Sequence, residues 1–120
     1  MRKESGRTRK IGELIQRELA GLIAHEMSDP RVAQVTITSV DVAPDLSHAK
    51  VYITHLAGEA EAKPVLAALK HAAGFLRHAL RERVILRHTP ELRFVYDVSV
   101  EHGDAIERLL AKARAERDEH

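Results

Sequence analysis

The sequence of 120 residues has no cysteine and few aromatic residues, with two Phe, two Tyr and no Trp. Without cysteine, the chain forms neither disulfides nor thiolate-ligated zinc sites. With so few aromatic rings, base stacking is not expected to dominate any recognition of nucleic acid. No apolar run reaches the roughly 20 residues that span a bilayer, and the N-terminus carries no hydrophobic signal region. We therefore expect a cytoplasmic protein that does not contact membranes.

The sequence also lacks the motifs of catalysis. Its eight histidines include no pair at the spacings that share a metal ion, since His71 and His78 would lie about 10 Å apart along a helix. Asp97, Ser99 and His102 have the composition of a catalytic triad, but neither a nucleophile elbow nor a glycine-rich oxyanion loop accompanies them. Strand-end hydrogen bonding is the simpler interpretation. No phosphate-binding glycine loop is present, so the sequence predicts no enzyme, no metal site and no cofactor.

A formal net charge of +1 conceals a segregation of charge along the chain. Residues 1–10 contain five basic side chains and one acidic side chain. Residues 70–93 contain six Lys or Arg against two Glu. Two concentrated basic regions in a nearly neutral chain indicate a polyanionic partner such as nucleic acid.

Apolar spacing divides the chain into a short series of elements. Their order, α-β-β-α-kink-α-β followed by a C-terminal helix, predicts an α+β fold in which a three-stranded sheet packs on helices. The apolar phase of the first strand changes near Ser39, which predicts a β-bulge. The other face of the sheet is expected to be open or lightly covered. The predicted elements are a helix over residues 8–27, a hairpin of strands over 35–42 and 48–56, helices over 64–88 that meet at Gly74, a strand over 92–97, and a helix after Gly103.

Residues 64–90 have the pattern of a long amphipathic helix with a glycine in its middle. Apolar residues occupy one side, and a group of cations lies within roughly 40° on the other side. Gly74 shares this basic face, where a mid-helix glycine costs about 1 kcal/mol relative to alanine and favours a kink. A kink would expose backbone amides beside the cations, which suits phosphate. A close-packing role for Gly74 and simple solvation of the charges remain alternatives at this point. The cations are Lys63, Lys70, Arg77 and Arg81.

Three segments of the chain resemble one bacterial family. They are PDLSHAKVY (residues 44–52), AAGFLRHAL (72–80) and RHTPELRFVYDVS (87–99). Together with DPR at 29–31, they closely resemble ribosome-binding factor A over nearly the whole chain. The resemblance implies a type II KH-like fold in which an Ala-x-Gly kink, here Ala72-Ala73-Gly74, replaces the GxxG loop of RNA-binding KH domains. Phe94, Tyr96 and Pro90 fit core and turn positions.

The resemblance also implies a function. Family members associate with free 30S small ribosomal subunits and assist late maturation of the subunit, including processing of the 5′ end of 16S rRNA. They matter for growth in the cold, are not enzymes, and leave the subunit with the help of a GTPase. We therefore expect a monomeric factor of ribosome biogenesis whose partners are 16S rRNA and the free 30S subunit.

The expected organisation is a flexible basic arm over residues 1–7, a KH-like RNA-binding domain over 8–110 and a charged tail over 111–120. Position and charge nominate the RNA-binding residues, since most such contacts are made to phosphates. Two other functions remain open: a small α+β enzyme that uses histidines on a phosphate ester, and a protein adaptor that uses the open sheet face or the last helix. The candidate RNA-binding residues are Arg7, Arg9, Lys10, Lys63, Lys70, Ala72, Ala73, Gly74, Arg77, Arg81, Arg83, Arg87 and His88.

Overall fold

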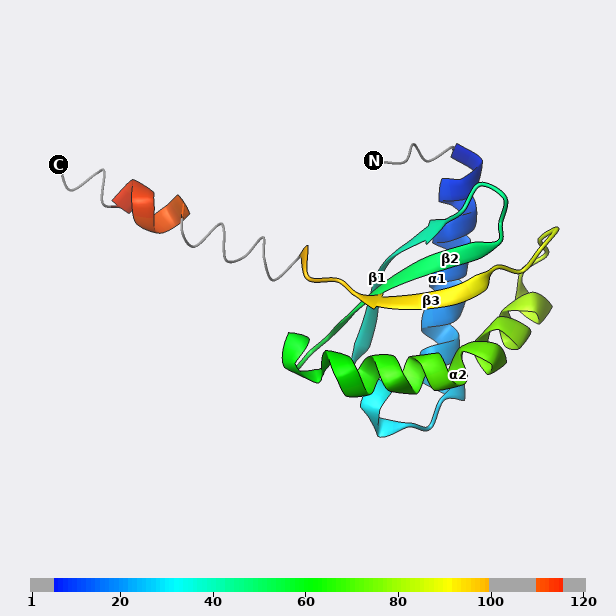
Figure 1. The fold of residues 1–120 in the computed structure, drawn as a ribbon, viewed down its shortest axis with the longest axis horizontal. Coiled ribbons are helices and arrows are strands. Elements are labelled where there is room, and N and C mark those ends of the chain that lie inside the picture. The colour runs from blue at the N-terminus through cyan, green and yellow to red at the C-terminus, as the bar shows by residue number, and fades with distance from the viewer. Residues whose placement is uncertain (1–5, 100–109, 116–120) are drawn as a thin grey trace.

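The structure is a computed structural model that describes residues 6–99 and 110–115. Three strands form one sheet, and two long helices pack against it (Figure 1). This arrangement confirms the predicted α+β fold with a three-stranded sheet. The elements are α1 (Gly6–Glu26), the short 3-10 helix η1 (Pro30–Val32), β1 (Val35–Val42), β2 (His48–His55), a second 3-10 helix η2 (Glu59–Glu61), α2 (Ala62–Arg83) and β3 (Glu91–Tyr96).

The sheet has β2 at its centre. β1 and β2 pair antiparallel as a hairpin, and β3 pairs in parallel with the other edge of β2. The hairpin register shifts between Ile37 and Ser39, so that Thr38 is an extra residue in β1. The shift confirms the predicted bulge. Because of it, Ile37 and Val40 both face the core although they are three residues apart.

Both helices cover the same face of the sheet. α1 packs on β1 and α2 packs on β3, and both helices join the inward-facing residues of β2 in one buried cluster. Lys50 of β2 and Arg93 of β3 point to the opposite face and are exposed, in line with the expected open face. The largest fully buried side chains include Ile15, Leu19, Leu22, Ile53, Leu69, Leu76 and Leu80.

Gly12 sets the distance between α1 and β1. A Cβ atom added at Gly12 would lie 2.6 Å from the carbonyl oxygen of Val40, well inside van der Waals contact. Only a residue without a side chain therefore lets the two backbones approach this closely. The sequence left close packing open as a role for Gly74. In the structure, Gly12 is the glycine that close packing requires.

α2 is a single helix. The prediction of two separate helices that meet at Gly74 is wrong, since the α-helix is continuous from Ala62 to Arg83. The predicted kink agrees with the change of direction that Figure 1 shows part-way along α2. A glycine weakens a helix by only about 1 kcal/mol and keeps both backbone hydrogen-bonding groups. Buried Leu69 and Leu76 hold the two halves in the core. The amides near Gly74 thus stay in the helical hydrogen-bond ladder and do not form the predicted anion site.

The start of α1 also differs from the prediction. The helix begins at Gly6 rather than at Thr8, which places Arg7 in its first turn. Arg7 therefore belongs to the helix and not to the predicted flexible arm. The first five residues of that arm lie outside the described residues.

α2 ends at Arg83, several residues before the predicted end near residue 88. At Val84 the backbone is extended, with φ −126° and ψ 124°, so the chain leaves the helix there. Most of the predicted C-terminal helix and tail lies outside the described residues. Residues 110–115, which are described, are helical and exposed.

Candidate nucleic-acid interface

A groove runs between α2 and β3. Its volume is about 590 Å³, within the range of roughly 300–1,000 Å³ that is usual for ligand sites. Apolar side chains and cations from both elements line it. We call it the α2–β3 groove. Its lining residues are Leu66, Ala67, Lys70, Ala73, Gly74 and Arg77 from α2, with Glu91, Leu92, Arg93 and Phe94 from β3.

Gly74 forms part of the groove wall without being needed for packing. It is exposed, and a Cβ atom built there would meet no atom within 4 Å. The close-packing alternative for Gly74 is therefore excluded. A residue without a side chain instead leaves the helix backbone accessible from the groove. Ala73 lines the groove beside it, whereas Ala72 packs against the core cluster.

Arg77 connects α2 to the segment before β3. Its Nε and Nη2 atoms donate hydrogen bonds to the carbonyl oxygen of Thr89, at 3.0 and 2.8 Å. These bonds span twelve residues and hold the two sides of the groove at a fixed separation. They use two of the five guanidinium N–H donors. Arg77, predicted as an RNA contact, thus has a structural role that its position on the helix did not reveal.

The other predicted cations of α2 differ in their surroundings. Lys70 is exposed and lines the groove, while Lys63 and Arg81 are exposed on the same helix outside it. Within residues 6–99 these three have no ion-pair partner. Arg83 is different, because its Nη2 lies 3.6 Å from Oε1 of Glu26 and so links the ends of the two helices.

The β3 side of the groove was not predicted. Phe94, assigned to the core from the sequence, packs against the core cluster but is only half-buried and also lines the groove. Arg93, on the open face of the sheet, also borders the groove because β3 is an edge strand. Its Nε lies 3.9 Å from Oε1 of Glu91. The alternation of Leu92, Arg93 and Phe94 shows which residues share a face of the strand. The alternation does not show which helix these residues meet, so the β3 side of the groove could not be predicted from it.

A second basic group lies where α1 begins. A hollow there is formed by α1, the turn between β1 and β2, and the chain after α2. Arg7, Lys10 and Arg87 line it, and we call these three residues the terminal basic cluster. His88 lines an adjoining recess with Asp45. Predicted Arg9 is exposed on α1 but lines neither cavity.

Asp97 caps the end of β3. Its Oδ2 accepts a 2.6 Å hydrogen bond from Oγ1 of Thr38, and its Oδ1 accepts from the backbone N–H and the hydroxyl of Ser99. The bonds from Ser99 and Thr38 lower the pKa of Asp97, so the carboxylate is ionised at neutral pH. The Ser99 hydroxyl donates its hydrogen bond to this carboxylate. This geometry agrees with strand-end hydrogen bonding; His102 lies outside the described residues.

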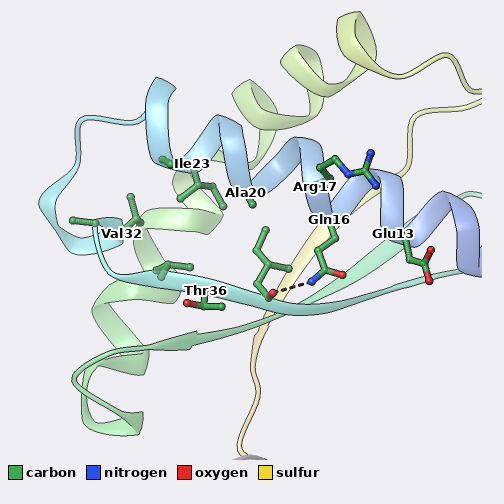
Figure 2. A pocket seen from close by; sticks show the side chains of 11 residues that line it. Glu13, Gln16, Arg17, Ala20, Ile23, Val32 and Thr36 are labelled. Atoms are coloured by element: carbon green, nitrogen blue, oxygen red, sulfur yellow. Dashed lines mark hydrogen bonds between the residues drawn. The ribbon is translucent and has the colours of Figure 1, made fainter.

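A further pocket lies between α1 and β1 (Figure 2). Glu13 and Arg17 bring opposite charges to it, and Gln16 Nε2 donates a 3.0 Å hydrogen bond to the carbonyl oxygen of Ile37 at the bulge. This mixture of charges does not favour a polyanion. Among residues 6–99 and 110–115, no cluster of three His, Asp or Glu side chains could hold a metal ion. Nor does any helix in these ranges have the length and apolarity to cross a membrane.

Comparison with known proteins bears on the family of the chain and on its fold. The family described as ribosome-binding factor A matches residues 7–110. The chain belongs to the ribosome-binding factor A family. The ribosome-binding factor A of Thiobacillus denitrificans is 50% identical over 120 residues, covering 100% of this chain and 97% of that protein. The family suggested by the three sequence segments is thereby confirmed.

Solved structures named for the ribosome-binding factor A family share the fold. The crystal structure of the factor from Thermus thermophilus matches with a TM-score of 0.67 and 30% identity, covering 74% of this chain and 94% of that chain. A homology model of the Thermus thermophilus factor, fitted into an electron cryo-microscopy map of a 30S complex, matches with a TM-score of 0.61 and 31% identity, covering 72% of this chain and 91% of that one. The type II KH-like fold implied by the resemblance is confirmed.

Proposed function

We propose that this protein binds free 30S ribosomal subunits through 16S rRNA and assists late maturation of the subunit, including processing of the 5′ end of the rRNA. The observation that carries the proposal is the α2–β3 groove, where Gly74 leaves the wall open and Lys70 brings a positive charge that has no ion-pair partner among residues 6–99. Membership of the family supports it. So does the 30S complex of the Thermus thermophilus relative.

The groove suits RNA because it combines two kinds of contact. Cations such as Lys70 contact phosphates, which contribute affinity but little sequence information. The apolar lining from Leu66 and Phe94 receives the ribose or base of a segment that is not in a regular duplex, the form of RNA that proteins read most readily. Binding of this kind holds a particular rRNA conformation and needs no catalytic group. As part of the proposal, the factor acts as a cytoplasmic monomer, a GTPase assists its release, and its loss matters most in the cold.

Charge reversal at Lys70 and Arg81 tests this function. Arg77 is left intact, because replacing it would break its bonds to Thr89 and deform the groove. The variant K70E/R81E should bind purified 30S subunits at least about tenfold more weakly, with a salt dependence reduced by about one to two units of slope. Co-sedimentation with 30S, 50S and 70S particles at two salt concentrations measures both quantities.

The matched control is R17E/K112E, which makes the same change of charge at exposed positions away from the groove. It should bind 30S subunits like the wild type. Equal binding by K70E/R81E and the wild type would refute a role for the α2 cations. Equal binding of the wild type to all three particles would reduce the proposal to general affinity for polyanions.

A further inference from the structure

Ile85 is an apolar side chain placed fully in solvent. Its exposed fraction is 102%, while Val84 before it is buried at 4% and Leu86 after it is half-buried. The chain becomes extended at Val84, so successive side chains point to opposite sides. Ile85 is therefore held outward by the backbone, between two residues that anchor the segment to the core.

This side chain lies at the hollow that contains the terminal basic cluster. Ile11, Leu46 and Leu86 give the hollow an apolar lining, to which Ile85 adds. Figure 1 shows the start of α1, the turn between β1 and β2, and the segment before β3 gathered at the same end of the molecule. The hollow therefore offers an apolar surface bordered by the three positive charges of Arg7, Lys10 and Arg87.

The charges of this cluster are unbalanced. Within residues 6–99, Arg7, Lys10 and Arg87 make no ion pair. Asp45 is the acid that lines the adjoining recess, and its carboxylate accepts a hydrogen bond from the backbone N–H of Ser47. The cores of protein–protein interfaces are depleted in charged residues and in lysine, although arginine is enriched in such interfaces. Apolar side chains among cations are instead typical of proteins that part the stacked bases of nucleic acids.

We propose that the hollow receives one unpaired, unstacked nucleotide of RNA. The base lies against Ile85 and the apolar lining, and Arg7, Lys10 and Arg87 contact the phosphates on either side of it. This inference rests on the proposed binding to the 30S subunit and adds a second contact, separate from the α2–β3 groove. A nucleotide held in this way is removed from its stack, so the protein would reshape the bound rRNA as well as hold it.

The substitution Ile85→Ser tests the contact, with Leu56→Ser as its control. Leu56 is 80% exposed and lines none of the cavities described above, so both changes remove an exposed apolar side chain. Affinity for purified 30S subunits should fall about fivefold or more for Ile85→Ser, as expected when a base loses an apolar partner, and should be unchanged for Leu56→Ser. In dimethyl sulfate probing of bound 16S rRNA, Ile85→Ser should lose the altered reactivity of at least one unpaired base.

A second variant separates RNA from a protein partner. Ile85→Tyr should bind 30S subunits at least as tightly as the wild type, because a base stacks well on an aromatic ring, whereas a protein pocket shaped for isoleucine would reject tyrosine. Loss of binding by Ile85→Tyr, or a wild-type probing pattern with Ile85→Ser, would overturn the inference. Failure of the wild type itself to bind 30S subunits would instead refute the proposed function on which it rests.

Discussion

Replacing Gly74 by alanine should make the protein more stable and a poorer RNA binder. The new methyl group meets no atom within 4 Å, so it carries no steric cost. The helix gains the difference in propensity between the two residues, about 1 kcal/mol, partly because alanine restricts the unfolded chain. For a domain of this size, a gain of about 0.5–1 kcal/mol corresponds to a rise in Tm of about 2–6 °C.

The same methyl group stands in the wall of the α2–β3 groove. It keeps the RNA backbone away from the helix, and we expect the affinity for 30S subunits to fall roughly tenfold, equivalent to about 1.4 kcal/mol. Gly21 provides the control. It lies in α1, an added Cβ atom there also meets nothing within 4 Å, and Gly21→Ala should gain similar stability without a change in binding.

Thermal unfolding followed by circular dichroism and titration of 30S subunits measure the two effects separately. A loss of stability in Gly74→Ala would show that the backbone at residue 74 needs glycine for its conformation. Unchanged binding would show that the opening in the groove wall has no part in recognition. Either result would refute the reasoning.

Two further predictions concern the scaffold. Gly12→Ala should lower the free energy of unfolding by about 1–3 kcal/mol, because the added carbon would lie 2.6 Å from the Val40 carbonyl oxygen. This cost outweighs the better helix propensity of alanine. Urea denaturation measures the change, with Gly21→Ala as the control. The pKa of Asp97 is lower in the folded than in the unfolded chain, so its stabilisation is present above about pH 3.9 and is lost as the pH falls through the folded-state pKa. Asp97→Asn should therefore lower the free energy of unfolding by about 1–3 kcal/mol at pH 7, and by progressively less at low pH. Denaturation at several pH values measures this loss. A loss of stability that does not change with pH would contradict the role assigned to the Asp97 carboxylate.

The sequence predicted the elements where its own periodicity decides the structure. The change of apolar phase in β1 located the bulge, because the pairing with β2 must bring both Ile37 and Val40 to the core. The predicted division into two helices at Gly74 does not occur, because tertiary packing of Leu69 and Leu76 outweighs a local weakness of about 1 kcal/mol. Local signals identify such a weakness but not the contacts that overcome it.

The candidate site shows the same division. The cations of α2 were found from one helical face, but the bond from Arg77 to the Thr89 carbonyl depends on how the chain returns from α2 to β3. Arg7 and Arg87 were nominated separately, and only the fold brings them to one hollow. Charge and spacing therefore identified the residues, whereas the topology determined which of them act together.

Because β3 pairs in parallel with β2 and follows α2 in the chain, we expect the groove to form late in folding. β1 and β2 follow each other directly in the chain, whereas the whole of α2 lies between β2 and β3. Such non-local contacts form slowly because the intervening chain must first lose entropy. β3 is also an edge strand, so we expect it to open more readily than the central strand β2. A ligand that bridges α2 and β3 would oppose this opening, and the RNA that the groove receives would thereby complete the fold that binds it.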